Sequence, residues 1–195
     1  MIPLAVVGIA YLLGAIPFGY LLVRWKTGKD VRAEGSGNIG ATNVMRTTGR
    51  AAGVLTLLLD IAKGWLAVWI AGRLTEQDPL WMSLAALCVM AGHAYPVFLR
   101  FKGGKAVASF VGAFLCLVPG ALAVEIIIFV VIVAWTRYIS MGSIVWAATF
   151  PLAVWLIHKE PLATLAAALA GAFIIYRHSS NIQRLRDGTE NRFKL

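Results

Sequence analysis

The stretch AVASFVGAFLCLVPGALAVEIIIFVVIVAW, residues 106–135, decides how often the chain crosses a membrane. It is 30 residues long, whereas one transmembrane helix needs about 20. Pro119-Gly120 lies near its middle, and such a pair is a strong turn signal. The stretch is therefore either one long kinked helix or two short ones, and this choice sets the side of the membrane on which every later loop lies.

The positions of lysine and arginine favour two short helices. With two helices, fifteen of the 18 basic residues lie on one side of the membrane, and only Arg73 and Lys159 lie on the other. With one long helix, the split is ten against seven. Since basic loops remain in the cytoplasm, we expect an all-α integral membrane protein with seven transmembrane helices, the N-terminus outside and the C-terminus cytoplasmic. The expected spans, two of them short, are residues 2–23, 53–72, 80–98, 106–118, 120–135, 139–157 and 162–176.

The overall composition is that of a membrane protein. The chain is 59% hydrophobic and 14% charged, with a mean hydropathy of +0.78, which excludes an ordinary soluble domain of 195 residues. We expect a single membrane domain over residues 1–195. The net charge of +9 is assigned to cytoplasmic loops and not to nucleic-acid binding. The N-terminal apolar run has no basic start and no cleavage pattern, so we expect a retained first span.

Two glycine-rich, basic segments interrupt the apolar runs: GSGNIGATNVMR at residues 35–46 and FKGGK at residues 101–105. The first matches G-x-G-x-x-G, but it lies in a short loop between spans and not in a βαβ unit, so we exclude a dinucleotide site. Glycine amides can turn toward an anion, and a nearby lysine or arginine neutralises its charge. Both segments thus predict phosphate binding at one membrane face, although the first, taken alone, is equally well a flexible, positively charged loop.

Polar groups in the second segment and in the tail fit the same chemistry. Lys105 precedes the helix expected from about Ala106, where the helix dipole disfavours a cation unless an anion is bound. His178 and Asn181 share a face if the tail is helical, and histidine can accept a proton or bind phosphate. Taken alone, the tail is more simply a solvated basic segment at anionic lipid, and His93 is more simply a packed polar residue.

Three acidic or basic side chains lie inside expected spans. Asp60 and Lys63 are three residues apart, and we interpret them as a structural pair that fixes helix packing near the site. The sequence assigns no role to Glu125. Cys88 and Cys116 lie in apolar runs and are interpreted as small hydrophobic residues. No cluster of histidine, cysteine, aspartate and glutamate has metal-ligand spacing, so neither a metal site nor a cofactor is expected.

Three motifs together resemble those of the PlsY family, the bacterial acyl-phosphate:glycerol-3-phosphate acyltransferases. The motifs are GSGNIGATNVMR (35–46), GHAYPVFLRFKGGKAVA (92–108) and HSSNIQRLRDGTE (178–190). The span with Asp60 and Lys63 is also similar, so that the resemblance covers essentially the whole chain. Two positions depart from the family pattern: Ile39 stands where the family usually has proline, and Ala106 where it often has glycine.

The resemblance implies an enzyme of the bacterial inner membrane whose cytoplasmic active site is formed by loops 24–52 and 99–106 and the tail 177–195. It implies transfer of a fatty acyl group from acyl phosphate to the sn-1 hydroxyl of glycerol 3-phosphate, which gives lysophosphatidic acid and inorganic phosphate. The partners are then these substrates and membrane lipid, without acyl-CoA or acyl carrier protein. In agreement, none of the three histidines has aspartate at the fifth position after it, as the H-x4-D motif of thioester-using acyltransferases requires.

The family's functional residues map onto positions that all lie in these loops and the tail. The expected catalytic residues are His178, Ser36 and Lys105. The expected substrate-binding residues are Ser36, Gly37, Asn38, Gly40, Thr42, Asn43, Arg46, Gly103, Gly104, Lys105, His178 and Asn181. The base is either His178 or a substrate phosphate. A membrane transporter for organic phosphates is the alternative, but such a protein would place its site near the bilayer midplane, often within an inverted repeat, and no such repeat is evident.

Overall fold

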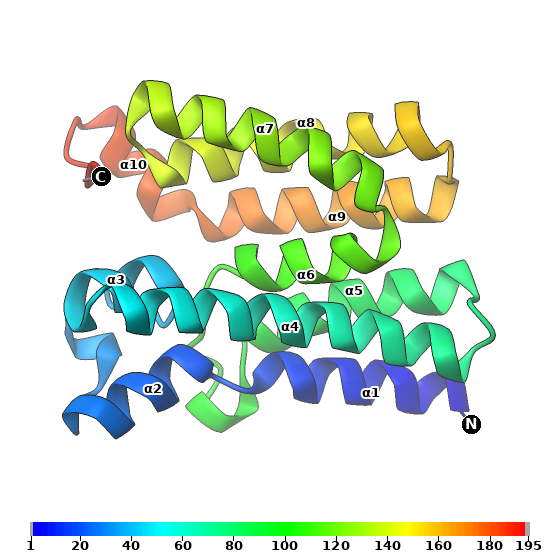
Figure 1. Cartoon of the computed structure of the whole chain (residues 1–195), viewed down its shortest axis with the longest axis horizontal. Coiled ribbons are helices and arrows are strands. Elements are labelled where there is room, and N and C mark those ends of the chain that lie inside the picture. Colours follow the sequence, from blue (N-terminus) through cyan, green and yellow to red (C-terminus); the bar gives the residue numbers. More distant parts are fainter. Residues whose placement is uncertain (1, 194–195) are drawn as a thin grey trace. The chain divides into compact units, whose positions relative to one another are not determined.

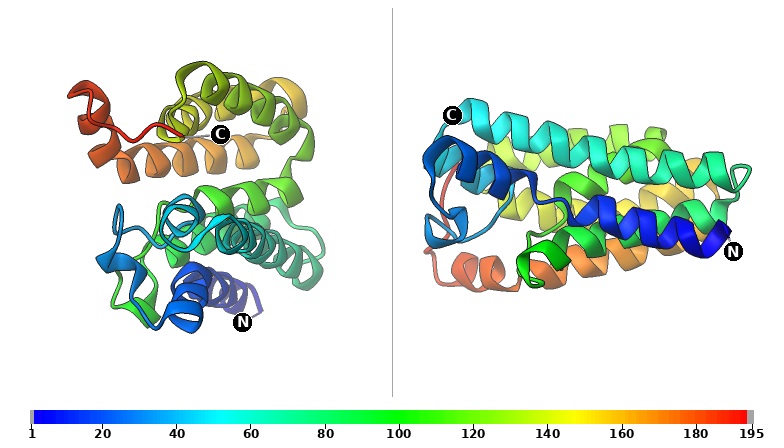
Figure 2. Two further views of the ribbon diagram at one scale, coloured as in Figure 1. Left: turned by 60° about the vertical axis from the view of Figure 1, so that its left-hand side comes forward. Right: turned by 90° about the horizontal axis from the view of Figure 1, so that it is seen from below.

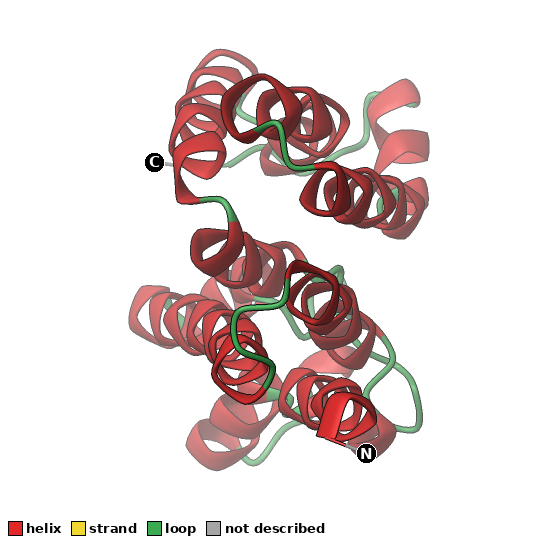
Figure 3. Ribbon diagram, turned by 90° about the vertical axis from the view of Figure 1, so that its right-hand side faces the viewer, coloured by secondary structure: helices red, strands yellow, loops and turns green. Residues whose placement is uncertain are grey.

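The computed structural model describes residues 2–193, which form helices and connecting loops without a strand (Figure 3). The helices group into two compact units, one up to Leu117 and one from Val118. The first unit contains α1 (Ile2–Ala15), α2 (Phe18–Thr27), the 3-10 helix η1 (Val31–Ala33), α3 (Ala41–Thr48), α4 (Arg50–Leu74), α5 (Pro79–Ala94), the 3-10 helix η2 (Val97–Leu99) and α6 (Val107–Leu117) (Figure 1). The second unit contains α7 (Pro119–Thr136), α8 (Ile139–His158), α9 (Pro161–Arg177) and α10 (Ser179–Arg186).

The first unit is built around α4. This helix contacts α1, α2, α3, α5 and α6, and Figures 1 and 2 show α1 and α4 running lengthwise beside each other. At the crossing of α4 and α6, a Cβ on Gly112 would overlap the backbone oxygen of Ile61. Glycine therefore permits the close approach that brings α6 against the middle of α4.

The first apolar run, expected as one span over residues 2–23, is divided into two helices by a break that was not predicted from the sequence. The break lies at Pro17, which has no N–H to donate and which restricts the backbone of Ile16. It leaves the carbonyl oxygen of Ile16 without its helical partner, and Lys63 Nζ donates to this oxygen at 2.8 Å. The helix resumes as α2, and α1 and α2 together form one candidate span of 24 residues, Leu4–Thr27.

In the second unit, α8 packs between α7 and α9 (Figure 1). Thr149 on α8 donates a hydrogen bond to Glu125 Oε2 on α7 at 2.8 Å, which gives the buried Glu125 carboxyl a structural partner. His158, at the end of α8, accepts the N–H of Ala121 through Nε2 at 3.3 Å and so satisfies an amide in the first turn of α7. After α9 the chain bends by 56° into α10.

Each expected span contains a helix, but not every helix is long enough to cross a bilayer. Among residues 2–193, five segments are long and apolar enough: Leu4–Thr27, Arg50–Leu74, Pro79–Leu99, Pro119–Thr136 and Ile139–His158. Counting α9 and α10 as one bent span makes six, whereas α6 has only 11 residues. The predicted break at Pro119-Gly120 is confirmed, because α6 ends before it and α7 begins there. The count of seven crossings and the orientation of the termini stay predictions.

Candidate active site

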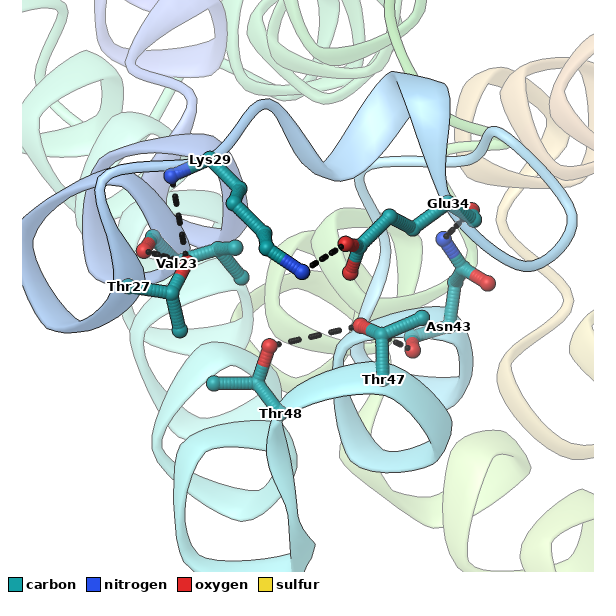
Figure 4. Close-up of polar contacts among 7 residues, drawn as sticks. All are labelled: Val23, Thr27, Lys29, Glu34, Asn43, Thr47 and Thr48. Atoms are coloured by element: carbon teal, nitrogen blue, oxygen red, sulfur yellow. Dashed lines mark hydrogen bonds and ion pairs between the residues drawn. The ribbon is translucent and has the colours of Figure 1, made fainter.

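Asn43, on the first turn of α3, holds the first glycine-rich loop in place. Its buried side-chain Nδ2 donates to the carbonyl oxygen of Asn38 at 2.9 Å and to that of Glu34 at 3.1 Å. Its Oδ1 accepts the backbone N–H of Ser36 at 2.8 Å. The amide of Asn43 therefore faces the loop backbone at both ends, as Figure 4 shows for the bond to Glu34.

The loop backbone is folded into a compact turn. Gly35 has φ +58°, a left-handed conformation that favours glycine, and a Cβ at this position would overlap Asn43 Oδ1. Asn38 Oδ1 accepts the N–H of Gly40 at 2.7 Å, directly before α3 begins. Ser36 remains exposed between these two fixed points. The loop thus presents backbone and a hydroxyl to the surroundings in a defined shape.

Charges around this loop are mostly paired. Glu34 accepts a hydrogen bond from Lys29 Nζ at 2.9 Å (Figure 4), which raises the pKa of Lys29. Asp30 accepts one from Arg32 at 2.6 Å, and this bond lowers the pKa of the Asp30 carboxyl. Arg46 differs, because its exposed side chain forms no hydrogen bond or ion pair with any residue that the structure describes. Its guanidinium is available to an anion.

The second glycine-rich segment folds back onto the end of α5. Gly103 donates its N–H to the carbonyl oxygen of Ala94 at 3.2 Å, and Gly104 donates to that of His93 at 3.1 Å. These two bonds place the half-buried Lys105 just before α6, as the sequence predicts. The segment is therefore fixed by the backbone of α5 on one side and by α6 on the other.

A buried polar network lies against this segment. Lys63 Nζ and Asp60 Oδ1, both on α4, are 2.7 Å apart, so the predicted pair is confirmed. His93 Nδ1 lies 3.6 Å from the same carboxyl oxygen and 3.2 Å from Ser109 Oγ. All four side chains are buried. His93 is thus a packed polar residue, as interpreted, and the network joins α4, α5 and α6.

In the second unit, His178 and Asn181 lie where α9 ends and α10 begins, and both are buried. His178 Nδ1 lies 2.8 Å from the carbonyl oxygen of Ile174. Because a carbonyl oxygen only accepts, Nδ1 carries the proton in this hydrogen bond. In the neutral ring the lone pair then lies on Nε2. This is the tautomer that a proton acceptor acting through Nε2 would need, whereas binding a phosphate oxygen through Nε2 requires a proton on that nitrogen.

Glu190 anchors the tail, and sequence reasoning missed this role. Its Oε1 accepts from Asn181 Nδ2 at 2.7 Å and from Ser140 Oγ at 2.9 Å, and its Oε2 accepts from Arg184 Nε at 2.7 Å. Burial opposes ionisation of this carboxyl, but the three hydrogen bonds outweigh burial and lower the pKa of Glu190. The sequence feature that could have indicated this role is the acidic residue itself, which follows the turn at Gly188 and ends the arginine-containing motif of residues 178–190.

Comparison with known proteins gives the family. A sequence model described as glycerol-3-phosphate acyltransferase matches residues 4–188. The glycerol-3-phosphate acyltransferase of Geobacter sulfurreducens is 48% identical over 191 residues, which is 98% of this chain and 97% of that protein. The chain belongs to the PlsY family of glycerol-3-phosphate acyltransferases.

Solved structures of PlsY, an integral membrane glycerol 3-phosphate acyltransferase, share the fold. Its glycerol 3-phosphate form matches with a TM-score of 0.94 at 39% identity, covering 98% of this chain and 96% of that chain. Its lysophosphatidic acid form matches with a TM-score of 0.90 at 38% identity, covering 98% and 95%. Together with the apolar helices, these matches identify the chain as a multi-pass integral membrane protein.

The residues expected to act in this PlsY family member are divided between the two units. The first unit carries those of the two glycine-rich segments: Ser36, Gly37, Asn38, Gly40, Thr42, Asn43, Arg46, Gly103, Gly104 and Lys105. The second unit carries His178 and Asn181. Within residues 2–193, no three histidine, cysteine, aspartate or glutamate side chains gather as metal ligands would.

Proposed function

We propose that this protein transfers a fatty acyl group from acyl phosphate to the sn-1 hydroxyl of glycerol 3-phosphate, releasing lysophosphatidic acid and inorganic phosphate. The observation that carries the proposal is the end-to-end match to PlsY in its glycerol 3-phosphate form, at 39% identity. The match to the lysophosphatidic acid form supports the product. The positive-inside distribution supports an inner-membrane protein whose active site is formed on the cytoplasmic side by loops 24–52 and 99–106 and the tail 177–195.

The reaction needs little help from a covalent enzyme intermediate. Acyl phosphate is a mixed anhydride, so its phosphate is a good leaving group. The hydroxyl oxygen of glycerol 3-phosphate attacks the acyl carbon, the bond from this carbon to the phosphate oxygen breaks, and phosphate leaves with the electron pair. Both reactants are anions that repel each other. Positioning and cationic groups should therefore supply most of the rate enhancement.

We assign the two phosphates to different residues. Basic and polar side chains hold the phosphate of glycerol 3-phosphate: Ser36, Arg46, Lys105, His178 and Asn181. The exposure of Arg46 and its lack of a partner among residues 2–193 support this assignment, since guanidinium binds phosphate at two points. The donor phosphate is assigned to Asn38 and Thr42 of the first glycine-rich segment. The N–H groups of Gly37, Gly40, Gly103 and Gly104, which were also expected to bind substrate, already donate to oxygens of the protein, so these glycines shape the segments. Asn43 is assigned to positioning the loop, because its amide faces the loop backbone.

Two groups could accept the proton of the attacking hydroxyl. One is His178 Nε2, whose lone pair follows from the hydrogen bond at Nδ1. The other is a phosphate oxygen of a substrate. Replacing His178 by glutamine, which keeps a hydrogen-bonding side chain but no base, separates the two: a large loss in kcat with little change in KM indicates histidine as the base.

A transporter of organic phosphates is the rival reading from another functional class. Transporters bind near the bilayer midplane at broken helices of repeated halves. Family membership favours the enzyme over this alternative. The two functions are separated by product, since only the enzyme forms lysophosphatidic acid.

The deciding experiment uses purified protein in liposomes with acyl phosphate, with and without glycerol 3-phosphate. Phosphate release that requires both substrates and yields lysophosphatidic acid supports the proposal. Accumulation of labelled glycerol 3-phosphate inside the vesicles without release overturns it. Arg46→Ala and Lys105→Ala should abolish turnover in folded protein. Arg50→Ala and Lys102→Ala remove equal charge from exposed neighbours and are the matched controls.

A further inference from the structure

We propose that the imidazole of His93 is the surface against which Gly104 packs, and that this contact sets the position of the segment Gly103–Lys105. His93 is then a positioning residue: it contacts the segment Gly103–Lys105, and it affects the substrate only through that segment. The inference rests on the proposed function only in that this segment binds a substrate phosphate.

The first observation is the contact between Gly104 and the ring. A Cβ built on Gly104 would overlap His93 Nε2, and it would lie 2.9 Å from Cδ2 of the same ring. The three heavy atoms nearest to that Cβ all belong to the His93 ring. The backbone of Gly104 is not in a left-handed conformation, so the missing side chain is explained by the ring and not by backbone strain. Gly104 is a glycine because His93 occupies the space.

The second observation is that the buried contacts of the His93 imidazole hold it in place. His93 is 4% exposed, and its Nδ1 edge faces Ser109 Oγ at 3.2 Å and Asp60 Oδ1 at 3.6 Å. Asp60 is itself held by Lys63 at 2.7 Å. Buried polar groups held by several partners resist displacement, because moving one leaves the others unsatisfied. The opposite edge of the ring, with Nε2, is the one that meets Gly104.

The third observation is the contrast with the neighbouring glycine. A Cβ on Gly103 would overlap the carbonyl oxygen of His93 and the Cδ of Pro96, and it would lie 2.8 Å from the carbonyl oxygen of Ala94. These are main-chain and proline atoms of α5 and the turn after it. Truncating the His93 side chain removes none of them. Truncation of the His93 side chain should therefore relieve the clash of a Cβ added at Gly104 but not that of a Cβ added at Gly103.

The consequence concerns the reacting groups. Lys105 follows Gly104 directly, so a shift of Gly104 away from the ring also moves the Lys105 backbone and the amides of the segment. A misplacement of about 1 Å can cost roughly 100-fold in rate when binding geometry carries the catalysis. The buried network of α4 and α6 thus acts on the phosphate-binding segment through one ring.

The test is a double-mutant cycle measured as kcat/KM for glycerol 3-phosphate in liposomes. Gly104→Ala should lower kcat/KM by at least about tenfold in the wild-type background and by less than about twofold in a His93→Ala background, because the ring that the new Cβ strikes is gone. Gly103→Ala is the matched control and should cost the same factor in both backgrounds. Equal penalties for Gly104→Ala in both backgrounds, or equal rescue of both glycine variants, would overturn the inference.

Two further measurements keep the test decisive. If His93→Ala does not give monodisperse protein, His93→Asn supplies a shorter side chain that retains a polar group beside Ser109. Hydrogen–deuterium exchange over residues 100–106 should rise in Gly104→Ala and should not rise further when that change is added to the His93 variant. This readout needs no turnover. Failure of wild-type protein to use acyl phosphate would refute the proposed donor and leave the exchange result to decide the contact.

Discussion

Asn43→Asp is the most informative single change in the first glycine-rich loop. The two side chains have nearly the same shape, and an aspartate oxygen still accepts the N–H of Ser36. The other oxygen replaces Nδ2 and faces the carbonyl oxygens of Glu34 and Asn38, at the positions now 3.1 Å and 2.9 Å from a donor. The change therefore converts two attractive contacts into two repulsive ones without altering side-chain volume.

The magnitude follows from these two bonds. Each lost hydrogen bond costs about 1 kcal/mol net, and leaving buried acceptors facing each other adds about 1–3 kcal/mol. The ordered conformation of residues 35–40 should thus be destabilised by about 3 kcal/mol or more relative to conformations in which the loop has left Asn43. Since about 1.4 kcal/mol is a factor of ten, the equilibrium constant between the ordered loop and other loop conformations should fall by about 100-fold. We expect kcat/KM for glycerol 3-phosphate acylation to fall by up to the same factor.

The control is Ala33→Asp, which adds the same charge at an exposed position just before the loop. This side chain takes no part in the bonds of Asn43 or in the bond from Gly40 N–H to Asn38, so the loop should keep its shape. Both variants are assayed in liposomes after size-exclusion chromatography confirms that they are monodisperse. Asn43→Asp should be at least about tenfold less active than Ala33→Asp. Equal activities of the two variants would show that added charge, and not loss of the Asn43 bonds, determines the effect, and would refute the reasoning.

Three further changes test other parts of the structure. Asp60→Asn leaves the Lys63 ammonium buried without its counterion, and thermal unfolding in detergent should show a destabilisation of about 3–5 kcal/mol; an unchanged Tm contradicts the ion pair. The lowered pKa of Glu190 means that its carboxylate stabilises the fold above the ordinary glutamate pKa of about 4.3, and that this contribution is lost as the pH falls through the folded-state value. Wild type should therefore exceed Glu190→Gln in Tm by a constant amount above about pH 5, with the gap closing in more acidic buffer; a gap independent of pH contradicts the assignment. Ala106 has φ +64°, so Ala106→Gly relieves left-handed strain of about 1 kcal/mol and should leave Tm unchanged or raised, whereas a clear fall would show that the alanine methyl packs favourably.

Local signals in the sequence predict most of the fold. Apolar runs and turn residues depend on nearby positions only, which is why Pro119-Gly120 separates α6 from α7 as expected. The same kind of signal at Pro17 was outweighed by the hydropathy of the run around it, and the break there was missed. The short helices α3 and α10 were not predicted as separate elements, because they are polar and lie in segments read as loop and tail.

In the candidate site, too, some features could be predicted from local sequence and others could not. Residue types that bind phosphate are visible in the motifs, and Lys105 precedes α6 as expected. Positioning roles are not visible, since they depend on partners brought together by folding. Glu190 accepts from Ser140, 50 residues earlier in the chain. His93 meets Asp60 only because α4 and α5 pack together, so its role in holding Gly104 has no local sequence signal.

The pairing of Asp60 with Lys63 also bears on how the protein enters the membrane. Both residues lie on α4 with i,i+3 spacing, so their side chains can meet as soon as that helix forms. The other partners are Ile16, in the break between α1 and α2, for the ammonium, and His93, on α5, for the carboxylate; both contacts require tertiary assembly. α4 therefore carries its own counterion into the bilayer with no net charge at that depth, and the separate cost of inserting an isolated acid and an isolated base is avoided. Assembly of the neighbouring helices then converts a pair needed for insertion into the network that contacts the glycine-rich segment.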